Sequence, residues 1–300
     1  MNAADLRVFE AVARLGAMNR AAAELNTVQS NVSARVRRLE QALAAPLFDR
    51  QSSGVVLTAA GRRLLPYAVK VARLLDEAAR AVADDGRPKG ALTIGSLETT
   101  AALRLSPVLS AYAAAHPGVD LVLRTGTTAE LIEQVLGHRL EGAFVCGPLD
   151  HPELLAEVVF TEELAVATAP TIGGIDELAR MVAPKIVVLR AGCSYRQRLE
   201  EILARRGIVD LRRLEFGTLD SIIGCVAAGL GVTLLPRSVL AQARREGRVA
   251  VHELPAADAR VETLFIRRRD AYASSALEAF LDCARPAPVL DEIDVRVAMT

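Results

Sequence analysis

The chain has 300 residues, of which 51% are apolar and none is Trp, so it is long enough for two domains with cores packed mainly by aliphatic side chains. Because it holds no run of roughly 18 apolar residues and no secretion signal, we expect neither a membrane span nor export. Its four cysteines form no CxxC pair, which argues against a structural zinc site and is typical of a reduced, cytoplasmic protein.

The formal net charge of zero hides an uneven distribution. Residues 1–65 carry nine arginines and five acidic residues, which leaves this end at +4 and the rest of the chain at −4. A basic end on a slightly acidic chain favours a polyanion as its partner. The alternative is an ordinary fluctuation of charge on a solvated surface.

The N-terminal end has the pattern of a helix-turn-helix. Apolar residues at helical spacing predict a first helix that ends at Gly16. A short helix over residues 19–25, a turn over residues 26–28 and a longer helix over residues 29–43 follow. This order of helix, short helix, tight turn and longer helix is that of DNA-binding helix-turn-helix proteins.

A hairpin and a long helix are expected next. Two short extended segments around Arg50–Gly54 predict a β-hairpin, the wing, after which Thr58 is placed to cap a helix of about Ala59–Ala83. Apolar residues repeat along that helix at heptad spacing, namely Leu64, Ala68, Val71, Leu75, Ala78 and Val82. Such a stripe favours pairing with a second helix, and packing against its own domain is the alternative. Residues 84–90 are expected to form a hinge.

Short apolar segments alternate with helical patterns in the rest of the chain, which predicts an α/β domain with mostly parallel strands. The expected strands are Ala91–Gly95, Val119–Thr125, Gly142–Val145, Lys185–Leu189, Leu211–Gly217 and Gly231–Leu235. The expected helices cover residues 102–115, 128–137, 194–206, 219–229 and 237–245.

Residues 5–66, DLRVFEAVARLGAMNRAAAELNTVQSNVSARVRRLEQALAAPLFDRQSSGVVLTAAGRRLLP, closely resemble the N-terminal signature of LysR-type transcriptional regulators. The matching residues are Phe9, Val12, Ala21, Ala22, Leu25, Gln29, Val32, Ser33, Leu39, Glu40, Leu43, Pro46, Leu47, Phe48, Arg50, Leu57, Thr58 and Gly61. The segments VVLRAGCSYRQRLEEILARRGI and EFGTLDSIIGCVAAGLGVTLLP also resemble the sensor domain of that family.

The resemblance covers essentially the whole chain and implies its organisation. A winged helix-turn-helix over residues 1–58 would bind double-stranded DNA. Residues 59–90 would form a dimerising linker helix and hinge. Residues 91–300 would form a two-lobed, periplasmic-binding-protein-like sensor, with lobe I about 91–162 and 265–300 and lobe II about 163–264. The family also implies a homodimer through the linker helix and commonly a homotetramer.

The DNA contacts implied by this resemblance lie on the third helix and the wing. Gln29 has the geometry to pair with adenine and Arg35 with guanine or a phosphate, while the short hydroxyl side chains reach base edges or phosphates. The expected DNA-binding residues are Gln29, Ser30, Asn31, Ser33, Arg35 and Arg50.

The expected effector site lies between the two lobes, where strands end and helices begin. Four such turns carry polar groups: Ser96–Thr100, Thr125–Thr128, Gly192–Arg196 and Phe216–Asp220. Hydroxyls and free amides at helix starts bind anions, so a small carboxylate-type metabolite is the expected ligand. The alternative for each hydroxyl is that it caps its own helix. The candidate residues are Ser96, Glu98, Thr99, Thr100, Thr127, Thr128, Cys146, Cys193, Ser194, Arg196 and Thr218.

Glu98 does not suit a purely anionic ligand, and we expect it either to pair with Arg196 or to bind an amino group. Because Cys193 and Cys225 lie in the sensor, a thiol redox-sensing regulator is one alternative. A solute-binding protein without DNA function is a second. The sequence shows none of the GxSxG, HExxH or phosphate-binding glycine motifs, and no spacing of metal ligands, so we expect no enzyme, cofactor or metal.

Overall fold

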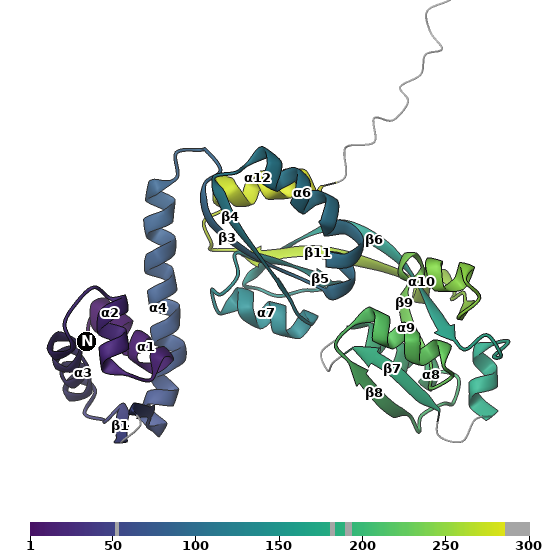
Figure 1. Ribbon diagram of the computed structural model, residues 1–300, viewed down its shortest axis with the longest axis horizontal. Helices are drawn as coiled ribbons and strands as arrows, with labels where there is room; N and C mark the ends of the chain where they lie inside the picture. The colour runs from purple at the N-terminus through teal and green to yellow at the C-terminus, as the bar shows by residue number, and fades with distance from the viewer. Residues whose placement is uncertain (52–53, 181–183, 190–193, 286–300) are drawn as a thin grey trace, which may run out of the picture. The chain divides into compact units, whose positions relative to one another are not determined.

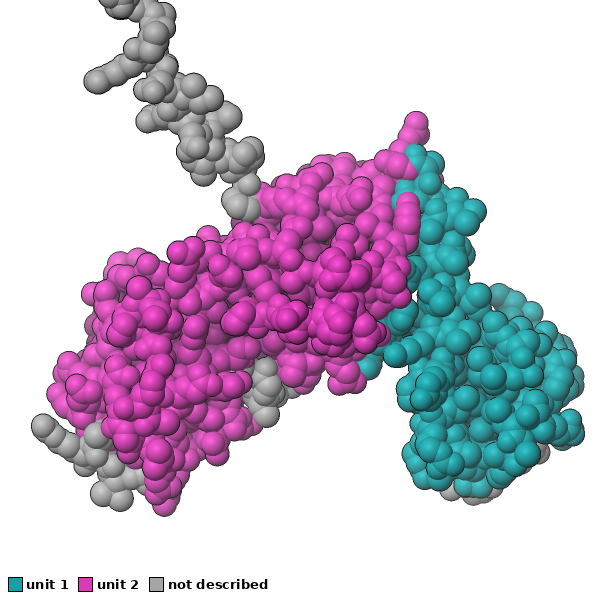
Figure 2. All heavy atoms as spheres, turned by 180° about the vertical axis from the view of Figure 1, so that it is seen from behind, with its two compact units in different colours: residues 1–85, 137–139 teal, residues 86–136, 140–300 magenta. Residues whose placement is uncertain are grey.

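The computed structural model describes residues 1–51, 54–180, 184–189 and 194–285. It divides into two compact units, residues 1–85 with 137–139, and residues 86–136 with 140–300 (Figure 2). Among the described residues, none of the helices combines the length and the apolar character needed to cross a bilayer.

Three short helices form the helix-turn-helix: α1 (Ala3–Leu15), α2 (Met18–Glu24) and α3 (Gln29–Leu43). The Asn2 side chain accepts a hydrogen bond from the amide of Asp5 and so caps α1 at its start. At its end, Gly16 adopts the left-handed conformation with φ of 68°. The buried core of the three helices consists of one phenylalanine with aliphatic and small side chains, namely Phe9, Leu6, Val12, Ala21, Ala22, Val32, Val36 and Leu39.

A buried carboxylate ties the first helix to the third. Asp5, which is 1% exposed, accepts hydrogen bonds from Arg35, at 3.4 Å, and from Arg38. The hydrogen bond from Arg38 makes the largest contribution to the lowered pKa of Asp5, and burial, which raises the pKa, is outweighed by the two guanidinium groups. Asp5 is therefore a charged anchor for the middle of α3.

The wing is the antiparallel pair β1 (Phe48–Gln51) and β2 (Gly54–Leu57). The Glu40 carboxylate, near the end of α3, accepts hydrogen bonds from the amides of Leu47 and Phe48, at 2.7 and 3.3 Å. On the other strand, the Val55 amide donates to the carbonyl of Gly16 at 3.1 Å. These backbone contacts fix the hairpin on the helices.

The long helix α4 (Ala59–Ala83) begins where expected, with Thr58 capping the Gly61 amide at 3.0 Å, and it continues through Pro66. The heptad stripe, however, serves two purposes. Its first three residues, Leu64, Ala68 and Val71, pack into the core of the helix-turn-helix. Its last three, Leu75, Ala78 and Val82, lie outside that core, with Leu75 exposed at 41% and Val82 at 89%. The expectation that the whole stripe faces a partner is therefore wrong for its first half.

The second unit is built on a mixed sheet, so the expectation of mostly parallel strands is wrong (Figure 1). Its strand order is β10-β6-β11-β5-β3-β4, with β9 also paired to β6. The strands are β3 (Gly90–Ser96), β4 (Val119–Thr125), β5 (Gly142–Cys146), β6 (Leu154–Thr168), β9 (Thr233–Pro236), β10 (Ala250–His252) and β11 (Arg260–Arg268). β3 lies parallel to β4 and β5, whereas β6, β9, β10 and β11 pair antiparallel.

The strand β6 connects the two lobes of this unit. Residues 154–163 pair with β11 in the first lobe, which also holds β3, β4 and β5. Residues 164–168 pair with β9 and β10 in the second lobe. That lobe includes the parallel pair β7 (Lys185–Leu189) and β8 (Arg212–Phe216), joined to the residue before β9 by a hydrogen bond of 2.8 Å from the Val187 amide to the carbonyl of Val232.

Helices cover the sheets on both faces. In the first lobe, α6 (Ser106–Ala115) and α12 (Ser275–Ala284) lie on one face and α7 (Thr128–Leu136) on the other (Figure 1). A short helix α5 (Glu98–Thr100) and a π-helical turn (Ala101–Leu105) lead into α6. The second lobe carries α8 (Ser194–Ala204), α9 (Leu219–Ala227) and α10 (Arg237–Arg245). Two short pieces, the 3₁₀ helix Ile175–Arg180 and α11 (Ala256–Ala259), complete the described helices.

Replacing the buried carboxylate tests the anchor between α1 and α3. Asp5→Asn should destabilise the helix-turn-helix at pH 7 by on the order of 1–2 kcal/mol, because it removes charged hydrogen bonds to Arg35 and Arg38. Since the folded pKa of Asp5 is lowered, this stabilisation is present above about pH 4 and is lost as the pH falls through the folded value. Hydrogen exchange of the α1 and α3 amides at several pH values measures it. An equal difference between the two proteins at every pH would contradict the role of the charge.

Candidate functional site

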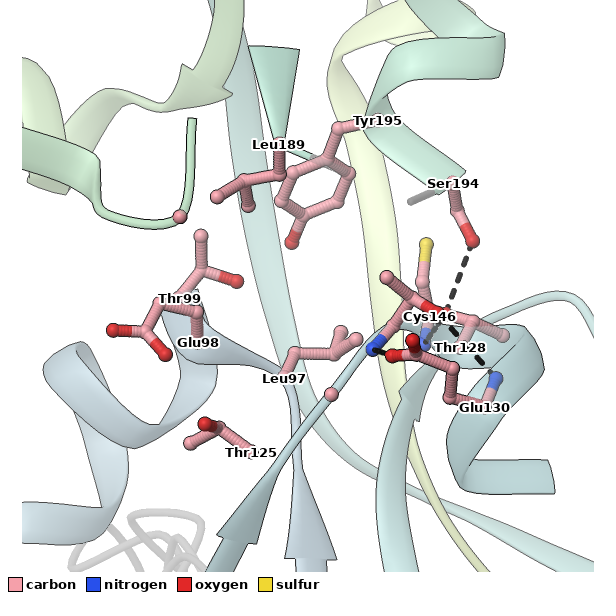
Figure 3. A pocket seen from close by; sticks show the side chains of 13 residues that line it. Leu97, Glu98, Thr99, Thr125, Thr128, Glu130, Cys146, Leu189, Ser194 and Tyr195 are labelled. Atoms are coloured by element: carbon pink, nitrogen blue, oxygen red, sulfur yellow. Dashed lines mark hydrogen bonds between the residues drawn. The ribbon is translucent and has the colours of Figure 1, made fainter. Parts of the chain in front are cut away.

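A pocket lies within the second unit where the carboxyl ends of five strands meet. It is formed by the residues that follow β3, β4 and β5 in one lobe and β7 and β8 in the other. This is the edge at which α/β sheets bind ligands. The lining residues are Leu97, Glu98, Thr99, Thr125, Gly126, Thr127, Thr128, Glu130, Cys146, Leu189, Ser194, Tyr195 and Gly217 (Figure 3).

Thr128 makes a hydrogen bond between the two lobes at this pocket. Its hydroxyl oxygen, at the start of α7, accepts a hydrogen bond from the Cys146 amide at 3.3 Å. It also accepts one from the Ser194 hydroxyl, at the start of α8 in the other lobe, at 3.1 Å. With both of these bonds accepted, the hydroxyl proton of Thr128 is left to donate.

Thr127 and Glu130 form a reciprocal cap at the start of α7. The Glu130 carboxylate accepts a hydrogen bond from the Thr127 amide at 2.9 Å, and the Thr127 hydroxyl accepts one from the Glu130 amide at 3.4 Å. This is the capping-box arrangement, which satisfies amides that the helix leaves without partners. For Thr127, the capping role considered from the sequence is thus present alongside its place in the pocket wall.

Six of the eleven expected effector-site residues line this one pocket. They are Glu98, Thr99, Thr127, Thr128, Cys146 and Ser194. One more, Cys193, lies outside the described residues. The described lining combines hydroxyl groups with two carboxylates, Glu98 and Glu130, and includes no Lys, Arg or His.

The other four expected residues do not line the pocket. Ser96 is fully buried on β3 and donates to the carbonyl of Leu97 at 3.0 Å, and Thr100 is buried one residue beyond the lining segment of α5. Thr218 caps α9 by accepting from the Ser221 amide at 3.4 Å. These three corrections have one cause, since a polar residue type does not reveal which way its side chain points.

Arg196 is the fourth correction, and it also removes one role expected for Glu98. Its guanidinium binds Glu200 at 3.2 Å and Glu215 at 2.6 Å, on α8 and β8. Arg196 is thus part of the second lobe's own surface, and the expected pairing with Glu98 is wrong.

Sequence reasoning missed the apolar part of the wall. Leu97, Leu189 and Tyr195 lie in or beside the turns that were predicted, and each is explained equally well as a core residue. A signal was present in the position of Leu97 and Leu189, because each follows or ends a strand that points at the same edge. Gly217 contributes a stretch of wall without a side chain.

The second candidate surface is the start of α3. Gln29, Ser30 and Asn31 are exposed there, and the Asn31 amide group donates to the Thr27 hydroxyl at 2.9 Å. Ser33 is partly buried. Arg35 is engaged with Asp5 on α1, so its guanidinium is held at the side of the helix. The side chain of Arg50 lies outside the described residues.

No metal centre or disulfide is found in the described part of the chain. Its His, Cys, Asp and Glu residues form no group of three or more that could hold a metal ion. Cys146, Cys225 and Cys283 are free thiols, and the Cys146 thiol donates to the carbonyl of Gly147 at 3.4 Å.

Comparison with known proteins gives matches along nearly the whole chain. The family model described as LysR substrate binding domain matches residues 85–288, and the model described as bacterial regulatory helix-turn-helix protein, lysR family, matches residues 3–62. The HTH-type transcriptional regulator YusT of Bacillus subtilis, named as uncharacterized, is 44% identical over 95% of this chain and 96% of its own. The regulator GltR of the same organism is 42% identical over 94% of this chain and 95% of its own.

Solved structures with this fold include two full-length regulators. A full-length OxyR variant from Pseudomonas aeruginosa matches with a TM-score of 0.69 at 21% identity, over 96% of each chain. CbnR complexed with its target DNA matches with a TM-score of 0.63 at 23% identity, over 95% of this chain and 99% of that one. At 21% and 23% sequence identity, the similarity to these structures establishes the fold alone.

A single hydroxyl deletion tests the contact between the lobes. Thr128→Val keeps the side-chain volume and removes the acceptor for the Cys146 amide and the Ser194 hydroxyl. We expect the free energy of unfolding to fall by about 1–2 kcal/mol, and amide exchange at Cys146 and at the start of α8 to become faster. Thr125→Val, which removes an exposed hydroxyl from the same wall, is the control. Unchanged exchange in Thr128→Val would show that the hydrogen bond does not hold the lobes.

Proposed function

The chain belongs to the LysR family of transcriptional regulators, and on this premise we propose which of its residues read DNA, which pair two subunits and which bind the effector. It is a DNA-binding regulator with an effector-binding domain, and its family consists of regulators rather than enzymes. Regulators of this family form oligomers. Since such a regulator acts on the chromosome, the proposal puts the protein in the cytoplasm.

The proposed DNA-reading surface is the start of α3, with the wing on the backbone. Its support is the exposure of Gln29, Ser30 and Asn31 in the first turn of a helix whose other face is buried. Gln29 would pair with adenine, while Ser30, Asn31 and Ser33 would contact base edges or phosphates. Arg35 is proposed as a phosphate contact, because its pairing with Asp5 keeps it from extending freely into a groove. Arg50 would hold a phosphate from the wing.

The proposed subunit contact is the free half of the α4 stripe. Leu75, Ala78 and Val82 repeat at heptad spacing outside the helix-turn-helix core, and Leu74 beside them is 53% exposed. An exposed apolar stripe on a helix is stabilised by pairing with a second such helix. The same helix of a second subunit gives a homodimer, and two dimers give the homotetramer that the resemblance implies.

The proposed effector site is the pocket between the lobes, and the observation that carries it is the hydrogen bond from Ser194 to Thr128 inside that pocket. A ligand in contact with both residues would favour one lobe arrangement and thereby shift the regulator between states. The donor groups at the starts of α7 and α8 favour a carboxylate or a similar acceptor on the ligand. Within the pocket, the centre of a water molecule can occupy a volume of about 50 Å³. A pocket of this size suits a small metabolite.

DNA reading is tested at the first residue of α3. Gln29→Ala should weaken operator binding by about 1–3 kcal/mol and relax the base preference at one operator position, because a bidentate pair with adenine is lost. Gln41→Ala, an exposed glutamine in the last turns of the same helix, should bind DNA as the unchanged protein does. Binding titrations against a set of operator variants measure both. Full affinity and full base preference in Gln29→Ala would refute the placement of the recognition surface.

Subunit pairing is tested on α4. Leu75→Asp puts a charge into the exposed stripe, which is costly in an apolar contact, so the dimer should dissociate at concentrations where the unchanged protein is paired. Arg73→Asp introduces an aspartate on the opposite side of the helix and should leave the dimer intact. Sedimentation velocity of the full-length proteins measures how each variant is distributed between dissociated and paired subunits. Equal dimer strength in both variants would remove α4 as the pairing surface.

A further inference from the structure

We infer that the effector carries a protonated amine together with its carboxylate, as an α-amino acid does, and that Glu98 binds the ammonium group. The inference rests on the proposed function of the pocket and deepens it by naming the chemical class of the ligand. It follows from the charges and the unused hydrogen-bonding groups of the pocket wall.

The first observation is an acid without a counter-ion. Glu98 lines the pocket and is partly buried, and within the described residues it forms no hydrogen bond or ion pair. Arg196, the cation expected to pair with it, is bound to Glu200 and Glu215. The other lining carboxylate, Glu130, accepts a hydrogen bond from the Thr127 amide. A bound ligand excludes water from the Glu98 carboxylate. This costs free energy unless the ligand supplies a positive group that pairs with the carboxylate.

The second observation is a hydroxyl group beside that acid. Thr99 is 2% exposed, lines the pocket and has no hydrogen-bond partner among the described residues. The Thr99 hydroxyl is therefore available to a ligand that enters the pocket. Figure 3 shows Thr99 and Glu98 on the same turn of α5, with the Tyr195 ring across the pocket from them. An ammonium group has three protons to donate, and a carboxylate and a hydroxyl oxygen are two suitable acceptors.

The third observation is that the two kinds of polar group stand apart. Figure 3 shows Glu98 and Thr99 on one side of Leu97, and Thr128 and Ser194 on the other. The Thr128 hydroxyl accepts from Cys146 and Ser194, which leaves its own proton for an acceptor. Two acceptors, Glu98 and Thr99, therefore lie at one end of the pocket. At the other end lie the Thr128 donor and two helix starts, beside the Glu130 carboxylate, which already accepts a hydrogen bond from the Thr127 amide (Figure 3).

Only a ligand with both charges satisfies both ends. A simple carboxylate would leave the partly buried Glu98 without a positive partner and would be repelled by it. A simple amine would leave the donors at Thr128 and the helix starts without an acceptor. A zwitterion with one ammonium and one carboxylate matches the ends of the pocket, and its net charge of zero avoids both costs.

The test is calorimetry on the full-length protein with the standard L-amino acids. Each amino acid is compared with the hydroxy acid that lacks the amine and with the amine that lacks the carboxylate. We expect at least one amino acid to bind and both of its partial analogues to bind at least about tenfold more weakly, since each loses a charged hydrogen bond. Glu98→Gln should weaken that amino acid about tenfold to a hundredfold and leave the hydroxy acid unaffected or tighter.

The control variant is Glu201→Gln, an equal change of charge on an exposed carboxylate that bonds only with Gln197 among its described contacts. Thr99→Val should weaken the amino acid as well. The inference is overturned if the hydroxy acid binds as tightly as the amino acid, if Glu98→Gln binds both as before, or if no amino acid binds at about 10 mM, where a weak Kd of about 1 mM is still measurable. A hydroxy acid that binds as tightly as the amino acid and is weakened by Thr128→Val would refute the role of Glu98 and support the pocket. Binding that neither Thr99→Val nor Thr128→Val alters would refute the pocket itself.

Discussion

The path of β6 sets the geometry on which the sensing unit depends. One uninterrupted strand of residues 154–168 pairs with β11 in the first lobe and with β9 and β10 in the second. The lobes are thus joined through extended, hydrogen-bonded backbone, and the strand ends that line the pocket come from both of them. The pairing of β6 changes from β11 to β9 between Glu163 and Leu164, so the two lobes are held by different partners of the same strand.

This geometry explains why the pocket is suited to control. Among the described residues, the hydrogen bond between Ser194 and Thr128 joins the two walls of the pocket, and a neutral hydrogen bond contributes only about 1 kcal/mol. The proposed ligand, with charged groups at both ends of the pocket, would outweigh a contact of that size. The difference in its affinity for the two lobe arrangements is then the free energy available to change how the regulator holds its operator.

The sequence was informative where the signals are local. The helices α1 to α4 have caps, breaks and apolar spacing within a few residues, and their positions follow from these. The strands β6 and β11 were not expected, and they pair with each other across about a hundred residues of chain, a contact that no local pattern reveals. At the site, the residues of the turns were predictable but their directions were not. Thr99 faces the pocket and Thr100 does not, and Arg196 is captured by Glu215 on a different element.

The most direct measurement is to recover the small molecule that stays with the full-length protein during gentle purification and to map its footprint by hydrogen exchange. The account predicts a molecule with an ammonium and a carboxylate group, and protection at the starts of α5, α7 and α8 together with the end of β5. Protection confined to other surfaces, or a bound molecule without an ionisable amine, would contradict it.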